Sequence, residues 1–118
     1  MDYTKIAYIG ERDAKYAKVI NSVSVAAGGV VTHSGFNVTG FKDIEVMVSS
    51  TGNVTVYPQV SYDNSTWYDI KAEDDSDLAY NCNNENIAFA VQHHAKYFRV
   101  VIYASTDSTV TVELYAQC

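Results

Sequence analysis

The sequence has few basic residues and no long apolar run. Its 118 residues include eight lysines and arginines against fourteen acids, so the net charge is −6. An acidic domain repels a phosphate backbone, and we therefore expect no nucleic-acid partner. The apolar runs are too short to cross a bilayer, and the first residues lack the basic and then apolar pattern of a signal peptide. We expect neither membrane association nor Sec-dependent export.

Cysteine and histidine are also scarce. Cys82 and Cys118 are too few for a zinc box, and such a pair in an unexported chain is usually reduced, although a disulfide between them stays open. His33, His93 and His94 have no cysteine or acid at ligand spacing, and adjacent histidines on a strand point to opposite faces. We therefore expect no metal site and no cofactor.

Catalytic motifs are missing as well. The sequence contains no Gly-x-Ser-x-Gly elbow, P-loop, dinucleotide fingerprint or Cys-x-x-Cys pair, and we predict that the protein is not an enzyme. The acids of segment 69–77 could offer oxygen ligands to Ca²⁺, but their spacing matches no EF-hand loop. A solvated acidic loop is the interpretation that we favour for this segment.

What the sequence does contain is alternation. Apolar and polar residues alternate in 54–62, 97–104 and 109–116, which places successive side chains on opposite faces of a sheet. Turn residues recur about every ten positions, and no sustained helical period is present. The sequence predicts an all-β protein, a single antiparallel β-sandwich or jelly roll of about eight to nine short strands.

Three finer features follow from the same reasoning. In 19–25 the odd-numbered residues are predicted to share one face of a strand. Segments 51–53 and 105–108 are predicted to be hairpin turns between consecutive strands. Pro58 lacks an amide hydrogen, which favours an edge strand or a bulge at that position.

The first residues differ from the rest. We divide the chain into an arm at 1–17 and a sandwich domain at 18–118. The arm has too many apolar residues for a free tail and too few for a core of its own. It is either a docking element that contacts another chain or the first strand of the sandwich. The residues expected to dock are Tyr3, Ile6, Tyr8 and Ile9.

The single tryptophan, Trp67, has two interpretations. A lone tryptophan on a strand after a tight turn is usually a core anchor, and we favour that interpretation. Alternatively, aromatic residues near it could form a platform for sugar rings. In that case Trp67 or several tyrosines should be exposed in a row. The platform would consist of Trp67, Tyr57, Tyr62 and Tyr68.

The order of strands and turns, which is clearest from segment 61–69 onward, resembles that of a known group of proteins. Segment 61–69, Ser-Tyr-Asp-Asn-Ser-Thr-Trp-Tyr-Asp, gives a strand, a polar turn and a Trp-Tyr pair. An acidic segment follows, then Tyr-Phe-Arg-Val-Val-Ile at 97–102 and a last strand with Thr-Val-Thr-Val-Glu-Leu. This order, over about residues 18–117, resembles small β-sandwich accessory virion proteins of tailed phages and related archaeal viruses.

The resemblance implies a function through surfaces and brings no catalytic residues. It implies a structural virion protein, in particular a capsid decoration or reinforcing protein that is made in the host cytoplasm and located in the virion. Its partners would be the major capsid protein or other virion subunits, together with copies of itself, a trimer being favoured. The alternative is a carbohydrate-binding sandwich that recognises a receptor on a tail or surface.

Overall fold

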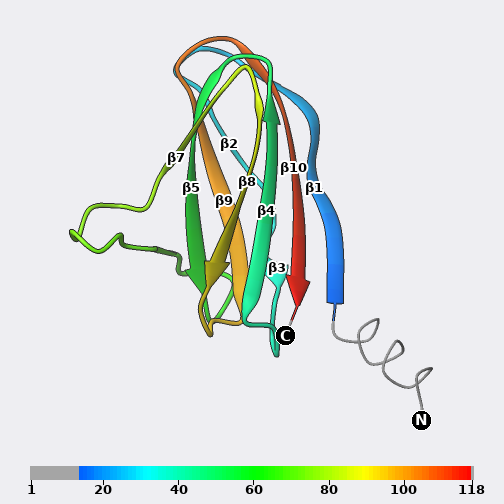
Figure 1. Ribbon diagram of the computed structural model, residues 1–118, viewed down its shortest axis with the longest axis vertical. Coiled ribbons are helices and arrows are strands. Elements are labelled where there is room, and N and C mark those ends of the chain that lie inside the picture. Colours follow the sequence, from blue (N-terminus) through cyan, green and yellow to red (C-terminus); the bar gives the residue numbers. More distant parts are fainter. Residues whose placement is uncertain (1–13, 118) are drawn as a thin grey trace.

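Two antiparallel sheets pack face to face, as the sequence predicts (Figure 1). The computed structural model describes residues 14–117. One sheet, sheet A, has the strand order β1-β10-β4-β8. Its strands are β1 (Ala14–Val25), β10 (Ser108–Gln117), β4 (Asp43–Ser50) and β8 (Asn86–Gln92).

The other sheet, sheet B, has the order β2-β9-β5-β6, with β3 paired to β9 and β7 paired to β5. Among the described residues there is no helix long and apolar enough to span a membrane. The strands of sheet B are β2 (Val30–Thr32), β3 (Phe36–Asn37), β5 (Asn53–Ser61), β6 (Tyr68–Asp69), β7 (Tyr80–Asn83) and β9 (Tyr97–Ala104).

The core lies between the sheets and follows the predicted alternation. Strands β4, β5, β9 and β10 turn every second side chain inward, where each large apolar side chain loses contact with water and contributes roughly 1.5–3 kcal/mol. The positions between them face outward. The largest fully buried side chains are Phe98, Ile44, Ile102, Leu114, Val38, Val46, Val48, Val54, Val56, Val100, Val110 and Val112.

Two predicted hairpins are wrong. β4 and β5 belong to different sheets, and so do β9 and β10, so their short connections cross the sandwich. The two crossings pack against each other, because a Cβ on Gly52 would lie 2.6 Å from the carbonyl oxygen of Asp107. A turn signal predicts where the chain reverses. It does not reveal whether both strands stay in one sheet.

Pro58 lies where β5 has no paired strand residue on the side away from β9, so the predicted edge position holds locally. It lies in β5, between the part paired with β7 and the part paired with β6. Opposite Pro58 in β9 is Val100, whose N–H donates to His33 Nε2 at 3.1 Å, on the side away from β5. The Pro58–Val100 pair is therefore a non-hydrogen-bonded pair, and the Pro58 nitrogen points away from β9 into the gap between β7 and β6, where no ladder amide is needed.

The prediction that the odd-numbered residues of 19–25 share one face of β1 is wrong. Both Ile20 and Val25 are buried, although they have opposite parity. The pairing with β10 shifts twice, between Lys18 and Ile20 and between Ile20 and Val23, and Ser22 has a φ of 51°. Such bulges change the phase of a strand, and the alternating pattern of the sequence does not reveal them.

The boundary expected at residue 17 falls inside a strand. β1 begins at Ala14 and pairs with β10 as far as Gln117, so 14–17 belong to the sandwich. The four predicted docking residues, Tyr3, Ile6, Tyr8 and Ile9, lie outside the described residues.

Cys82 is a free and fully buried thiol. It pairs with Val54 at the end of the sandwich where β5 begins, and its Sγ donates to the carbonyl oxygen of Glu85 at 3.2 Å. Burial raises the pKa of Cys82, which keeps it in the unreactive thiol form at neutral pH.

Candidate functional site

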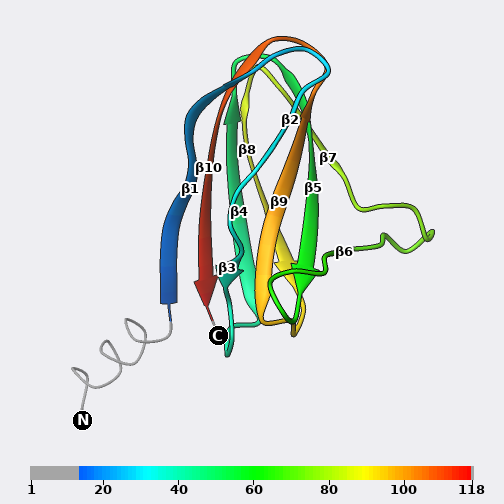
Figure 2. The same ribbon diagram turned by 180° about the vertical axis from the view of Figure 1, so that it is seen from behind.

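The outward side of sheet B carries a continuous group of aromatic and apolar side chains, here called the aromatic face. Strand pairing brings Val30 beside Tyr103 and Val101 beside Tyr57 (Figure 2 shows sheet B in front). Val30 is 61% exposed and Tyr103 is 42% exposed. The aromatic face consists of Val30, Tyr57, Gln59, Trp67, Arg99, Val101 and Tyr103.

A polar network crosses the same face. Arg99 Nε donates to Gln59 Oε1, and Gln59 Nε2 donates to Asp69 Oδ1, each at 2.8 Å. The guanidinium of Arg99 lies 4.3 Å from the centroid of the Trp67 ring, a cation–π contact. Burial lowers the pKa of Arg99 and the Asp69 charge opposes this, but arginine stays charged at any physiological pH. The network links four side chains, those of Asp69, Gln59, Arg99 and Trp67.

Trp67 is not the core anchor that we favoured. It is half-buried and lies outside the core cluster, under Arg99 and against Gly35. A Cβ on Gly35 would lie 3.0 Å from the Trp67 ring and would also collide with the amide of Asn64. Glycine at this position leaves the space that the indole fills.

The turn before Trp67 is tightly hydrogen-bonded. Asp63 Oδ1 accepts from the backbone N–H groups of Ser65 and Thr66, at 2.9 and 2.8 Å, and from the Ser61 hydroxyl at 3.0 Å. These bonds lower the pKa of Asp63 to about 2, and the bond from the Thr66 N–H has the largest effect. Asn64 completes the turn with a φ of 60°. The turn therefore fixes the direction of the backbone that enters Trp67.

The four aromatic residues predicted as a sugar platform do not lie in one row. Tyr57 and Trp67 are on the aromatic face. Tyr68 pairs with Val60 and is exposed on the opposite side of β6, and Tyr62 is exposed in the turn. Sequence reasoning missed the remaining members of the aromatic face. The alternation in β9 could have identified three of them, because Arg99, Val101 and Tyr103 alternate with Phe98, Val100 and Ile102.

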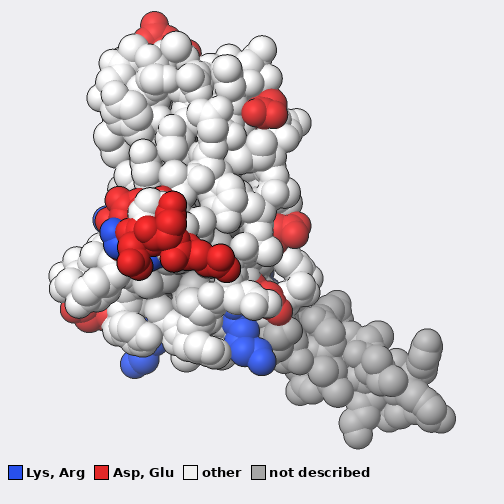
Figure 3. Space-filling view, turned by 60° about the vertical axis from the view of Figure 1, so that its left-hand side comes forward, with Lys and Arg blue, Asp and Glu red and all other residues white. Residues whose placement is uncertain are grey.

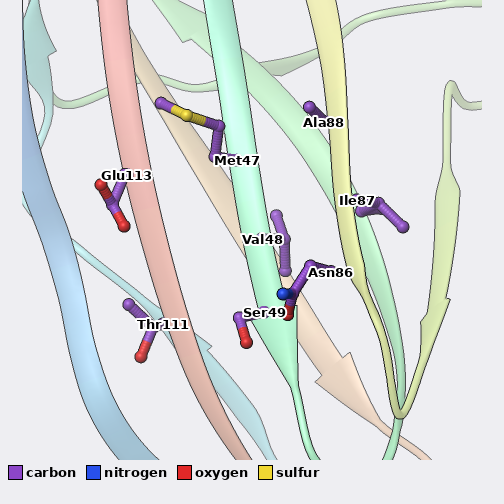
Figure 4. Close-up of a pocket in the computed structure, with 8 residues that line it drawn as sticks. All are labelled: Met47, Val48, Ser49, Asn86, Ile87, Ala88, Thr111 and Glu113. Carbon is purple, nitrogen blue, oxygen red and sulfur yellow. The ribbon is translucent and has the colours of Figure 1, made fainter.

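The outward side of sheet A is different, and we call it the hollow face. A shallow depression of about 350 Å³ runs over β10, β4 and β8 (Figure 4). Its floor is low because Ser49, Ala88 and Thr111 have short side chains. Glu113 Oε2 accepts from the hydroxyl of Tyr16 on β1 at 2.6 Å, and this bond raises the pKa of Tyr16. The depression is lined by Met47, Val48, Ser49, Asn86, Ile87, Ala88, Thr111 and Glu113.

The acidic segment forms a loop that projects beside sheet B. Figure 3 shows its acids gathered in one exposed cluster. Lys71 pairs with Asp77 across the base of the loop, and Asp74 accepts from the N–H of Ser76 at 3.1 Å. Within residues 14–117 no three His, Cys, Asp or Glu side chains converge as metal ligands would.

The histidines complete backbone pairing rather than facing one another. His33 Nε2 accepts the N–H of Val100 between β2 and β3, and His93 Nδ1 accepts the N–H of Ala95 at 3.1 Å. Burial lowers the pKa of both His33 and His93. Both rings are therefore neutral acceptors near pH 7, which suits these bonds.

Comparison with known proteins supports the fold. No protein-family model matches the sequence, and curated proteins give no match. Among solved structures, the PBSX exported protein XepA is similar over 89% of this chain, with a TM-score of 0.69 and 12% identity. The chain spans 37% of the length of XepA.

Two further structures are similar over nearly their whole lengths. The SPBc2 prophage-derived protein YomS matches over 90% of this chain and 94% of its own, with a TM-score of 0.63 and 14% identity. The N-terminal cellulose-binding domain of Cellulomonas fimi β-1,4-glucanase C matches over 92% and 91%, with a TM-score of 0.50 and 11% identity. At these identities the similarity shows the fold alone. It is a sandwich found in phage-derived proteins and in sugar-binding modules.

Proposed function

We propose that this protein is a non-enzymatic structural protein of a phage or phage-derived particle, and that it decorates or reinforces the capsid through protein contacts. The aromatic face is the observation that carries the proposal. Tyrosine, tryptophan and arginine are the residues that most often dominate the binding energy of protein interfaces. Here Tyr57, Tyr103, Trp67 and Arg99 share one face of a rigid sheet.

The side chains of this face are already held in place before a partner binds. Arg99 is held by Gln59 and Trp67, so little side-chain entropy remains to be lost when a partner covers it. Val30 and Tyr103 supply exposed apolar surface beside it. Burial of such surface between subunits stabilises a shell, and many copies on a lattice strengthen individually modest contacts. The similarity in fold to YomS and XepA agrees with this role.

The partner in this proposal is the major capsid protein or another particle subunit, and the protein is located in the particle. The arm remains part of the proposal as a second docking element. Because residues 14–17 of the predicted arm belong to β1, deletion of residues 1–13 removes the four predicted docking residues and keeps every described strand.

Co-sedimentation with purified empty capsids of the parent phage tests this function. The full chain is expected to sediment with capsids at a saturating stoichiometry. Loss of binding after deletion of residues 1–13 would assign docking to the arm, and unchanged binding would assign it to the sandwich. A full chain that stays in the supernatant at all concentrations would contradict the decoration role.

Carbohydrate binding is the second candidate, and one observation favours it. Gln59 and Asp69 are linked to the Trp67 ring through Arg99, and such hydrogen-bonding groups beside an aromatic ring suit a pyranose with an apolar face and hydroxyl groups. The cellulose-binding domain of similar fold agrees with it. A glycan array with the full chain and a Trp67→Ala variant tests this role. Glycan binding that Trp67→Ala abolishes supports it, and no binding on the array contradicts it.

A further inference from the structure

β8 is the last strand of sheet A, and one of its edges has no neighbouring strand (Figure 1). The N–H of Ser50 donates to the carbonyl of Glu85, and the N–H of His93 donates to the carbonyl of Lys42. Even-numbered residues of β4 therefore turn their peptide groups toward β8. In this register their hydrogen-bonded partners are Ile87, Phe89 and Val91.

The even-numbered residues of β8 consequently direct their N–H and C=O groups away from the sheet. These residues are Asn86, Ala88, Ala90 and Gln92. Within residues 14–117 no group forms a hydrogen bond to the peptide groups on this edge. Unpaired edges of this kind are templates for the addition of another strand.

The two edges of sheet A differ in protection. β1 carries Lys15 and Lys18 and two register shifts, and these features discourage pairing at an edge. β8 carries no charged residue, no proline and no bulge over its seven residues. An edge without such protection is available for pairing with another strand.

The sequence of β8 identifies what fits this edge. Read from either end, Asn-Ile-Ala-Phe-Ala-Val-Gln has the same residue classes about its centre, Phe89. An amide, a β-branched residue and an alanine flank Phe89 on both sides. In an antiparallel pair of identical strands related by a two-fold axis, each residue faces the one at the mirrored position. β8 is therefore complementary to itself.

We propose that β8 pairs with β8 of a second copy, antiparallel and about a two-fold axis at Phe89. Ala88 of each copy faces Ala90 of the other, and Asn86 faces Gln92. All four residues have free peptide groups, so each of these pairs exchanges two hydrogen bonds. Phe89 faces Phe89 as a non-hydrogen-bonded pair, in which side chains approach most closely and aromatic pairs stabilise the ladder.

The surroundings of Phe89 suit this geometry. Its ring already stacks on Tyr80, with centroids 3.7 Å apart, so it is held in place before association. The acidic loop, between Asp69 and Tyr80, projects on the side of the open β8 edge and nearer the Gln92 end of that strand, so the second copy lies beside it (Figure 1). The two-fold axis places the loop of the second copy on the opposite side of Phe89, so the two acidic clusters do not face each other.

The evidence for this dimer does not depend on the proposed function, but the dimer would strengthen that function. Sheet A of one copy joins sheet A of the other to form one continuous sheet. Sheet B of each copy lies on the same side of this continuous sheet. Two aromatic faces are thereby presented in one direction, which gives a bivalent binder. The symmetry is two-fold, whereas the family resemblance favours a trimer.

Light scattering coupled to size exclusion of the full chain tests the pairing. The expected mass is twice 13.0 kDa. Ala88→Lys and Ala90→Pro are expected to shift it to the monomer. Ala90→Pro removes an N–H that points away from β4, so the monomer tolerates it as edge strands tolerate proline. Ala26→Lys, the same change at an exposed residue that follows β1 at the opposite edge of sheet A, is expected to remain a dimer.

Hydrogen exchange of the unmodified chain gives a readout that needs no variant. The amides of Ala88 and Ala90 exchange slowly if β8 is paired and rapidly if its edge is free. A monomer at every concentration, or a dimer that persists in both variants with rapidly exchanging Ala88 and Ala90, would overturn the proposal. Capsid binding is scored separately, so failure of the dimer and failure of the decoration role are distinguishable.

Discussion

The two outer faces of the sandwich are built from strands of the same kind but carry different side chains. On sheet B the outward positions hold Tyr57, Arg99 and Tyr103, and hydrogen bonds and stacking fix several of them. On sheet A the outward positions over the depression are short, such as Ser49 and Ala88. The inward positions of the two sheets hold similar residue types, because both use valine, isoleucine and leucine or phenylalanine.

The difference separates the residues that form the fold from those that are available for contacts with a partner. Inward residues set the sandwich, because they remove apolar surface from water. Outward residues contribute little to folding and are free to specify contacts. The aromatic face concentrates groups that bind well, whereas the hollow face concentrates groups that leave space. The partner contact that we propose therefore lies on sheet B.

The largest expected effect separates inward from outward positions within β9. Phe98→Ala removes a fully buried ring and should lower the free energy of unfolding by about 3–5 kcal/mol. Tyr103→Ala, an outward change on the same strand, should alter it by no more than about 0.5 kcal/mol. Urea denaturation followed by circular dichroism measures both. Similar losses for the two variants would refute the assignment of the faces.

Gly35→Ala should disturb the aromatic face from beneath. A Cβ at this position meets Asn64 and the Trp67 ring, and overpacking of this kind costs about 1–3 kcal/mol. The tryptophan fluorescence should shift because the indole is displaced. An unchanged spectrum together with unchanged stability would mean that Trp67 is not held against Gly35.

Acidification should lower the free energy of unfolding through the two histidines that accept backbone hydrogen bonds. Burial lowers the pKa of His33 and His93, so the folded state binds fewer protons than the unfolded state below about pH 6.5. The contribution of these rings to stability is present above that pH and is lost as the pH falls through the lowered pKa values. His33→Gln should reduce this pH dependence. Unfolding free energies measured from pH 7.5 to 5 that stay constant would contradict the prediction.

The stacking of Arg99 on Trp67 should contribute a smaller, measurable coupling. A double-mutant cycle with Trp67→Ala and Arg99→Ala is expected to give a coupling energy of about 0.5–1 kcal/mol. Additive effects of the two substitutions on the free energy of unfolding would mean that the contact does not persist in solution.

The smallest expected effect lies on the hollow face. Glu113→Gln should bring the pKa of Tyr16 down toward its ordinary value of 10.0, because a charged acceptor no longer favours the phenol. Stability should hardly change, since both groups are exposed at the surface. Spectrophotometric titration of the tyrosines measures the shift, and an unaltered Tyr16 titration would argue against the bond.

The alternation of the sequence predicts the sandwich, most of its strands and the inward positions of β4, β5, β9 and β10. It does not predict which strands pair. The crossing at Gly52 and the phase shift at Ser22 depend on contacts between segments far apart in the chain. Trp67 was misplaced for the same reason, because Gly35 and Arg99 hold it outside the core. A local pattern cannot specify such contacts.

The most direct test of the account is a matched pair of substitutions, one on each face. Tyr103→Asp and Tyr115→Asp make the same change at tyrosines that are 42% and 37% exposed, on sheet B and sheet A respectively. The dissociation constant for empty capsids should rise about 30-fold or more for Tyr103→Asp, as for a hot-spot residue, and stay within about 3-fold for Tyr115→Asp. Equal effects, or a larger effect of Tyr115→Asp, would contradict the assignment of the partner contact to the aromatic face.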